Sequence, residues 1–262
     1  MAFLKTNNAN FYYELHGTGQ PIILIAGYAC DHTSWLAVLD ELAKNFQVLI
    51  FDNRAVGQTT DDNLKLTAKL MADDVINLAH QLNLKKPHII GHSMGGSIAQ
   101  TVASLYPEKI GKLCLLNSSA KWRKAMQLGF KSIFMMRENN FDLNFTIDSV
   151  IPWIYGEKFL SSEENINAVR LAILNNPYPQ SIGDQKRQID MTEEFDGISA
   201  LKNIKSPTLI AYGKEDIVSL NYEAEFLANQ IKDAKLAKFD CAHGIMFEVP
   251  QQLTRALIDF LQ

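Results

Sequence analysis

The sequence PHIIGHSMGGSIAQTVASL, Pro87–Leu105, is more informative than any other part of this chain of 262 residues. It begins as an apolar strand and continues as a helix, and Ser93 lies at the turn, flanked two residues away on each side by Gly91 and Gly95. This pattern is typical of a nucleophile elbow, a turn so sharp that larger flanking side chains would clash. We therefore expect Ser93 to act as a nucleophile. The alternative is a glycine-rich turn without chemistry.

A serine nucleophile needs a base, and the base needs an orienting carboxylate. His243 is the one histidine that follows Ser93 in the sequence, so we expect it to be the base. Asp216 follows a buried strand-like run, and catalytic groups gather at the carboxyl ends of the strands in an open α/β sheet. Its neighbour Glu215 and the later Asp240 are alternative acids, but we favour Asp216.

Together with three further motifs, these residues make the chain similar to the α/β-hydrolase family, in which nucleophile, acid and histidine follow in that order. Ile22–Tyr28 followed by Trp35 resembles the first-strand signature of the family. The stretch Asp52–Thr59 (DNRAVGQT) resembles its Asp-x-Arg-Gly-x-Gly-x-Ser loop. The sequence from His243 to Pro250 matches its closing His-x-x-x-x-Glu-x-Pro motif. The motifs are most similar to the 3-oxoadipate enol-lactonase-like and small carboxylesterase branches.

The resemblance implies an α/β fold with a mostly parallel sheet, helices on both faces and an inserted helical cap. It places the two main-chain N–H groups of an oxyanion hole at Tyr28 and Met94. Ala26 stands where the family usually has histidine, so we expect backbone contacts to hold the oxyanion loop. Ser93 at the nucleophile position argues against an epoxide or haloalkane hydrolase, which would carry aspartate there.

Strand-like and helix-like runs alternate along most of the chain, and several strands are continuous apolar runs, as expected for a sheet that is covered on both faces. The expected strands are Phe11–Leu15, Ile22–Ala26, Val48–Asp52, His88–Gly91, Leu113–Asn117, Thr208–Tyr212 and Lys235–Phe239, and the expected helices are Trp35–Lys44, Ala68–Leu82, Ser97–Tyr106, Asn221–Ile231 and Gln251–Phe260. The alternation stops between residues 119 and 205. We therefore divide the chain into a hydrolase core of residues 1–118 and 206–262 and a helical cap of residues 119–205.

The cap segment is rich in aromatic residues and methionine although it has no predicted sheet of its own. Ligand sites are concave and mainly apolar, so some of these side chains should line a substrate pocket. Our candidates are Phe134, Met135, Trp153 and Tyr155. The alternative is that such residues only attach the cap to the core, which we expect for more than half of them.

Arg54 and a basic stretch at the start of the cap each have two interpretations. Arg54 could bind a substrate carboxylate or pair within the protein. The basic stretch precedes the first acidic cap residue, Glu138, and is either a solvated face or a docking surface for an acidic partner such as an acyl carrier protein. It comprises Lys121, Arg123, Lys124, Lys131 and Arg137.

Composition favours a globular enzyme with a substantial core, since 47% of the residues are hydrophobic. The net charge of −4 is mild and gives no reason to expect nucleic-acid binding. The first residues lack a long apolar stretch, so we expect no signal peptide or membrane span. The 3 cysteines show no metal-ligand spacing and suit a reducing cytoplasm. We expect no metal and no cofactor, and the oligomeric state is open.

Three classes of function follow from these residues. The first is hydrolysis of a small carboxylic ester or lactone by a Ser-His-Asp triad. The second uses the same triad for carbon–carbon bond hydrolysis, acyl transfer or perhydrolysis. The third is a ligand-binding or receptor protein on a hydrolase scaffold, which an intact triad argues against. We favour the first.

Overall fold

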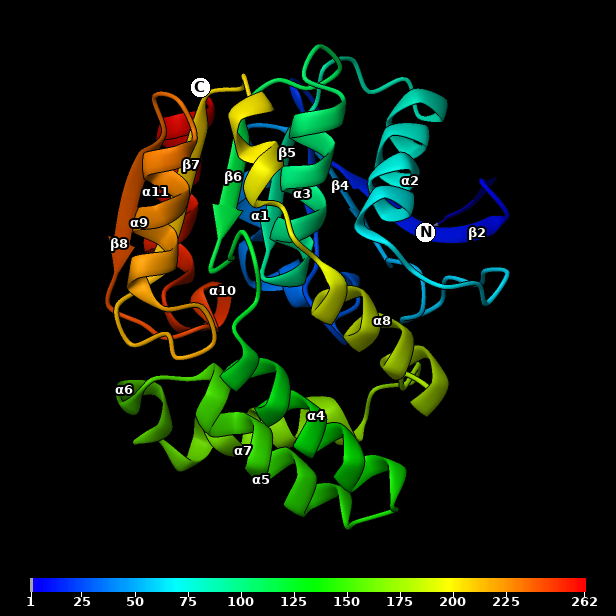
Figure 1. Cartoon of the computed structure of the whole chain (residues 1–262), viewed down its shortest axis with the longest axis vertical. Coiled ribbons are helices and arrows are strands. Elements are labelled where there is room, and N and C mark those ends of the chain that lie inside the picture. Colours follow the sequence, from blue (N-terminus) through cyan, green and yellow to red (C-terminus); the bar gives the residue numbers. More distant parts are fainter. Residues whose placement is uncertain (1) are drawn as a thin grey trace.

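A computed structural model describes residues 2–262 of the chain, which form one eight-stranded sheet with helices on both faces (Figure 1). The strand order is β1-β2-β4-β3-β5-β6-β7-β8. Strands β3 to β8 run parallel, and β1 and β2 form an antiparallel edge. The strands are β1 (Ala2–Thr6), β2 (Ala9–His16), β3 (Pro21–Ile25), β4 (Gln47–Phe51), β5 (His88–His92), β6 (Leu113–Leu116), β7 (Thr208–Gly213) and β8 (Lys235–Phe239).

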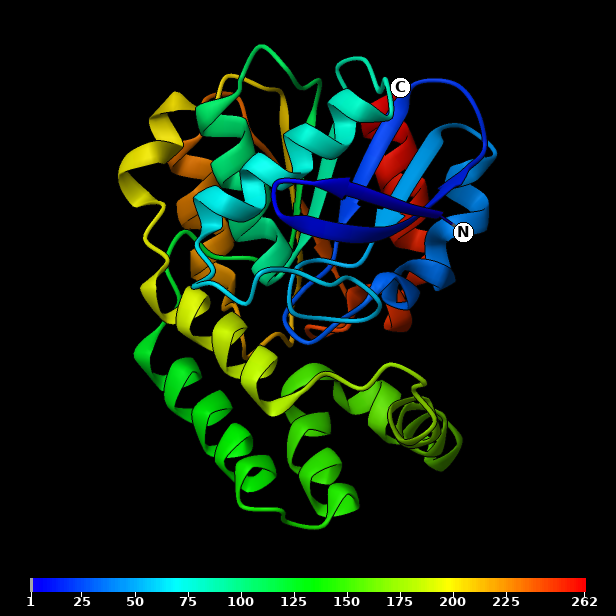
Figure 2. The ribbon, with the colours of Figure 1, turned by 90° about the vertical axis from the view of Figure 1, so that its right-hand side faces the viewer.

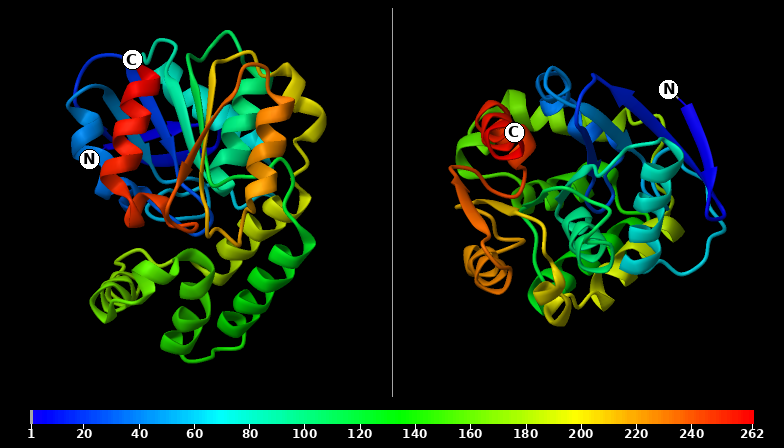
Figure 3. Two further views of the ribbon diagram at one scale, coloured as in Figure 1. Left: turned by 90° about the vertical axis from the view of Figure 1, so that its left-hand side faces the viewer. Right: turned by 90° about the horizontal axis from the view of Figure 1, so that it is seen from above.

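The central strands are apolar along their whole length because both of their faces are covered. In β3, Ile22 and Leu24 pack into one buried cluster, while Ile23 and Ile25 pack into the cluster on the opposite face. Alternation of side chains along a strand produces this division. Seen from above, α1 (Leu36–Ala43) and α11 (Pro250–Leu261) lie on one face, and α2 (Ala68–Gln81), α3 (Met94–Leu105) and α9 (Asn221–Gln230) lie on the other (Figure 3).

Strand β1 was not expected from the sequence. It pairs with β2 through a two-residue turn at Asn7 and Asn8, whose positive φ angles of 50° and 59° are those of a hairpin turn. Its residues alternate between half-buried and exposed, because it is an edge strand. The remaining expected strands and the five core helices all form. Helix α3 begins three residues before the expected Ser97, because the chain enters the helix directly from Ser93.

The sequence between β6 and β7 forms the inserted cap, which lies below the carboxyl edge of the sheet (Figure 2). Its last part packs on the core, since Met191, Leu201 and Ile204 belong to the core cluster that also holds α2 and α3. The inserted elements are α4 (Lys124–Glu138), α5 (Leu143–Ile154), α6 (Glu157–Leu160), α7 (Glu163–Leu174), α8 (Ile182–Glu194) and the 3-10 helix η2 (Ile198–Asn203). Two short core elements complete the fold, η1 (His32–Trp35) and α10 (Ile245–Glu248).

Candidate active site

Ser93 occupies the expected sharp turn between β5 and α3, with φ 54° and ψ −120°. Such positive φ values are costly for a residue with a side chain, so the surrounding structure must impose this one. The two flanking glycines explain how the turn fits. A Cβ atom on Gly91 would lie 2.3 Å from the carbonyl oxygen of Gly95, and one on Gly95 would lie 2.1 Å from that of Ile25.

The structure brings Ser93, His243 and Asp216 together at the carboxyl edge of the sheet. The Ser93 hydroxyl donates to Nε2 of His243 at 2.9 Å, and Nδ1–H of His243 donates to Oδ2 of Asp216 at 2.9 Å. The three residues follow β5, β8 and β7 respectively. Asp216 and His243 are 2% and 3% exposed. The arrangement has the geometry of a nucleophile, a base and a carboxylate that orients the base.

Asp216 is held as a carboxylate by several donors. Its Oδ1 accepts the backbone N–H groups of Val218 at 2.8 Å and Ser219 at 3.0 Å. Its Oδ2 accepts the Asn117 side-chain amide at 2.6 Å in addition to His243. Burial alone would raise the pKa of Asp216, but the charge of His243 and these hydrogen bonds outweigh it and lower the pKa. The sequence analysis did not identify Asn117 as part of the site, although its position directly after β6, at the carboxyl edge of the sheet, is a signal for it.

The two alternative carboxylates are engaged elsewhere. Oε2 of Glu215 accepts the backbone N–H of Glu157 in the cap at 3.0 Å. Asp240 is exposed and forms an ion pair with Lys214 at 2.9 Å, and this lysine holds the pKa of Asp240 below its ordinary value. Within residues 2–262, Asp216 is the carboxylate that hydrogen-bonds the ring of His243.

Tyr28 and Met94 lie beside Ser93 and line the same cavity. In the described part of the chain, neither of their backbone N–H groups has a hydrogen-bond partner, so both are free to receive an anion. The loop that follows β3 is held through its backbone atoms, as expected from Ala26, and the partners of these atoms are side chains. Gln188 of the cap accepts the N–H of Ala29 at 2.9 Å, and Asn53 donates to the Ala26 carbonyl at 3.1 Å.

His92, the residue before Ser93, contacts the loop of His243. Its Nε2–H donates to the backbone carbonyl of His243 at 3.0 Å, while its Nδ1 is buried without a partner among the described residues. Burial, reinforced by the charge of His243, lowers the pKa of His92 to about 3. His92 is therefore a neutral ring that holds the His243 loop, a role that the sequence did not suggest.

Ser93 opens into a small cavity between the sheet edge and the cap. Its wall is mostly apolar and has three polar residues on the cap side. The lining residues are Tyr28, Ser93, Met94, Trp122, Met126, Gln127, Phe130, Ile189, Thr192, Glu193 and Val218. The cap therefore covers Ser93 with residues of α4, α8 and the segment that precedes α4.

The four pocket candidates from the sequence are not among these lining residues. Phe134 is buried within the cap, whereas Met135 is 49% exposed. Trp153 packs edge-on against Phe130, with 5.9 Å between ring centroids, so it supports a wall residue from behind. Tyr155 stacks on Phe159. Periodicity places apolar residues on a helix, but it does not tell which face of that helix turns toward Ser93.

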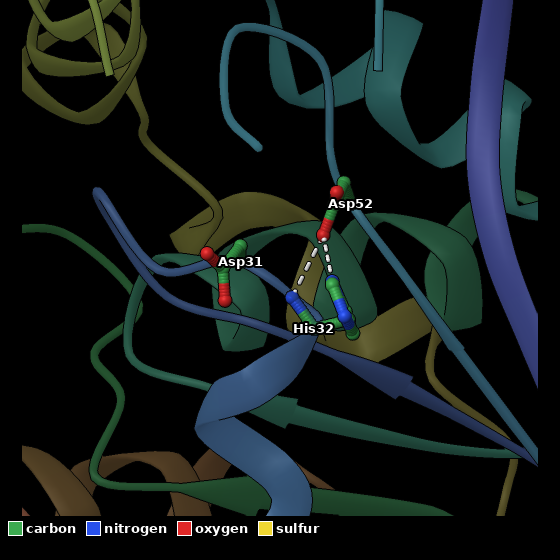
Figure 4. Close-up of side chains that lie close together, drawn as sticks. All are labelled: Asp31, His32 and Asp52. Carbon is green, nitrogen blue, oxygen red and sulfur yellow. Dashed lines mark hydrogen bonds and ion pairs between the residues drawn. The ribbon is translucent and has the colours of Figure 1, made fainter. Parts of the chain in front are cut away.

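A second group of titratable side chains lies away from Ser93, where Asp31, His32 and Asp52 offer ligand atoms within 4.8 Å of one another (Figure 4). The Asp52 oxygens are already hydrogen-bonded. Oδ1 accepts the backbone N–H of His32 at 2.8 Å and its Nδ1–H at 2.7 Å, and Oδ2 accepts the N–H of Gln58 at 2.8 Å. Burial would lower the pKa of His32, but the hydrogen bond and charge of Asp52 outweigh it and raise the pKa. A metal ion would have to displace these donors, and the contacts of Asp52 instead join the start of η1 to the segment that follows β4.

Arg54 is 1% exposed and does not line the cavity. Its guanidinium binds Asp74 in two places, at 2.6 Å through Nε and at 3.0 Å through Nη2. This pairing within the protein is the second of the two interpretations given to Arg54.

The basic stretch of the cap is largely engaged within the chain. Lys121 pairs with Asp196, Arg123 with Glu223, and Arg137 donates to Gln185 and to the carbonyl of Gln180. Lys124 and Lys131 are exposed.

The fold and the Ser93 site are those of an α/β-hydrolase, and the chain belongs to that family: the family model described as the alpha/beta hydrolase fold matches residues 20–250. The chain is therefore an enzyme of the hydrolase class. Among curated proteins it is similar to RutD of Azorhizobium caulinodans, named provisionally as a carbamate hydrolase. The two are 27% identical over 99% of this chain and 98% of the relative.

Solved structures show the same fold along nearly the whole chain. MGS-M2, an α/β-hydrolase enzyme from a Medee basin deep-sea metagenome library, has a TM-score of 0.90 and 25% identity, covering 99% of this chain and 97% of that one. The enol-lactonase of Burkholderia xenovorans has a TM-score of 0.88 and 20% identity, covering 99% of each chain, and shows likeness of fold. In residues 2–262, no helix is both long and apolar enough to cross a membrane.

Proposed function

We propose that this protein is a serine hydrolase that cleaves a small carboxylic ester or lactone through an acyl-enzyme. The observation that carries the proposal is the continuous hydrogen-bonded series from Asp216 through His243 to Ser93, with 2.9 Å at each step. A buried carboxylate that fixes the ring tautomer leaves Nε2 of His243 free to take the serine proton. The proposal assigns the roles of nucleophile, base and orienting acid to these three residues.

The proposed reaction proceeds in two halves. Ser93 Oγ attacks the substrate carbonyl carbon while His243 takes its proton, and the tetrahedral oxyanion accepts the N–H groups of Tyr28 and Met94. His243 then gives the proton to the leaving alcohol oxygen as the ester bond breaks. Water, deprotonated by His243, hydrolyses the acyl-enzyme and returns Ser93 to its starting state. In a lactone the leaving alcohol stays attached to the acyl group.

The cavity supports a modest, largely apolar acyl group. Trp122, Met126, Phe130 and Val218 give it an apolar wall, as is usual for a site that binds an apolar group. We also propose that residues 119–205 act as the cap that sets substrate size, because Ser93 faces this covered cavity.

The substrate class is tested with purified protein and a panel of matched substrates. The panel holds p-nitrophenyl acetate, a five-membered lactone, a p-nitrophenyl carbamate and a diketone, each with the parent and with Ser93→Ala. The carbamate is included because RutD carries that activity in its name. We expect the ester or lactone to give the highest kcat/KM and the serine variant to be inactive. Preference for the diketone would favour carbon–carbon hydrolysis, and Ser93-independent turnover would refute the proposal.

A further inference from the structure

Glu193 gives the cavity at Ser93 a negative charge that the proposed reaction does not use. Among the described residues that line this cavity, Glu193 is the sole acidic one, and none is lysine, arginine or histidine. Tyr28 also carries an ionisable group, but burial raises the pKa of its hydroxyl far above the ordinary value, so it is neutral. Glu193 is therefore the one residue with a charged side chain among the described residues that line the cavity.

Nothing in residues 2–262 neutralises this carboxylate by a hydrogen bond or an ion pair, unlike its neighbours. Glu194 pairs with Lys65 at 2.7 Å, and Lys186 on the same helix is held by Asp190 at 2.7 Å. Glu193 also lies in the last turn of α8, where the negative end of the helix dipole disfavours an acid. Glu193 is therefore unfavourable for the stability of the helix end, and its carboxylate forms no hydrogen bond or ion pair within residues 2–262 that would offset this.

The polar atoms next to Glu193 also offer lone pairs and not protons. The Thr192 hydroxyl donates its hydrogen to the Gln188 carbonyl at 2.9 Å, so its oxygen can only accept. Nε2 of Gln127 donates to the carbonyls of Trp122 and Glu193, both at 3.3 Å. Its Oε1 accepts a hydrogen bond from Nζ of Lys124 at 3.4 Å, and Lys124 is exposed and is not one of the lining residues. The polar side of the cavity is therefore rich in acceptors.

We infer that Glu193 determines specificity, selecting substrates whose part beneath the cap carries a hydrogen-bond donor or a positive charge, and rejecting those that carry a second carboxylate. The inference rests on the proposed ester or lactone hydrolysis at Ser93. A carboxylate beneath the cap would meet the like charge of Glu193 and neighbouring polar atoms that only accept hydrogen bonds. An ammonium, hydroxyl or amide N–H group at the same place would meet acceptors.

The test compares a neutral and an anionic ester of equal size, together with a larger cationic ester. Ethyl levulinate and ethyl hydrogen succinate differ only in a terminal methyl group against a carboxylate oxygen, and ethyl 4-(trimethylammonio)butanoate supplies the positive charge. Proton release with a pH indicator gives kcat/KM for each. We expect the parent to prefer the neutral ester over the anionic one, and Glu193→Gln to reduce this preference about tenfold, as two charges separated by a partly hydrated gap predict. Glu193→Lys should invert it, and the cationic ester should become a poorer substrate in both variants.

Glu194→Gln is the matched control, because it removes the adjacent charge on the outer side of the helix. It should leave all three kcat/KM ratios unchanged. Equal ratios in the parent, Glu193→Gln and Glu193→Lys would overturn the inference, and so would an equal effect of Glu194→Gln. Ser93→Ala separates this failure from failure of the proposed function: unchanged ratios with Ser93-dependent turnover remove only the role of Glu193, whereas turnover without Ser93 removes both.

Discussion

Replacing His92 by glutamine should reduce the amount of unfolding free energy that the protein loses when the pH falls into the mildly acidic range. His92 is 6% exposed, and its pKa is lowered to about 3, chiefly by burial and then by the charge of His243. In the unfolded chain the same ring titrates near its ordinary pKa of about 6.5. Below that pH the His92 ring binds a proton in the unfolded state, whereas in the folded state it stays neutral down to about pH 3. The stabilisation is therefore complete above about pH 6.5 and is lost as the pH falls toward 3.

The magnitude follows from the linkage relation. Between about pH 7.5 and pH 5.5, one histidine that stays neutral in the folded state costs about 1.4 kcal/mol of unfolding free energy. Glutamine does not titrate and can still donate its amide N–H to the His243 carbonyl. His88 contributes in the same direction, because burial and then Lys112 lower its pKa to about 4. Between about pH 7.5 and pH 5.5, the titration of these two histidines should therefore lower the unfolding free energy of the parent about twice as much as that of His92→Gln, in which only His88 still titrates.

The assay is urea denaturation followed by tryptophan fluorescence at the two pH values. The exposed His80→Gln supplies the control, since its ring is already in water. His88→Gln should reduce the loss of unfolding free energy by a similar amount. In the double variant, the part of the pH dependence that both rings cause should disappear. If the parent and His92→Gln lose the same free energy between the two pH values, the ring is not held neutral as the structure implies.

Three further changes test the site and its support. Asp216→Asn should lower kcat on p-nitrophenyl acetate by about three to four orders of magnitude, while Asp240→Asn stays near the parent, because only the first orients the base; equal losses would refute the choice of acid. Gly95→Ala should lower the melting temperature or prevent folding, since its Cβ would lie 2.1 Å from a backbone oxygen; an unchanged melting temperature would contradict that packing. Asp74→Ala should cost about 3 kcal/mol of unfolding free energy, because the buried Arg54 then keeps only the Asn7 carbonyl and a longer contact of 3.4 Å to Asp62, and a cost below about 1 kcal/mol would contradict it.

The parts of the site that sequence could predict are those that depend on local pattern. Gly91 and Gly95 mark the elbow because the turn leaves no room for side chains, and the position of His243 follows from the requirement for a base after Ser93. Likewise, continuous apolar runs such as β3 predict a sheet that is buried on both faces. These features can be read from a few neighbouring residues.

Other features depend on contacts between distant parts of the chain. Asn117 reaches Asp216 across 99 residues, and Gln188 of the cap reaches Ala29 across 159, so no local pattern indicates either contact. The pocket candidates Phe134, Met135, Trp153 and Tyr155 fall outside the described cavity for the same reason, because the cap's orientation over the sheet decides which helix faces Ser93. Strand β1 went undetected because an edge strand is not required to be apolar.

Covalent labelling of Ser93 tests the central proposal most directly. The parent protein, Ser93→Ala and Asp216→Asn are each treated with a fluorophosphonate probe, and the modified residue is located by peptide mass spectrometry. The account predicts rapid, single labelling of Ser93 in the parent, none in Ser93→Ala, and labelling slowed by orders of magnitude in Asp216→Asn, because the base then loses its orienting partner. Labelling at another residue, or equally fast labelling in Asp216→Asn, would contradict it.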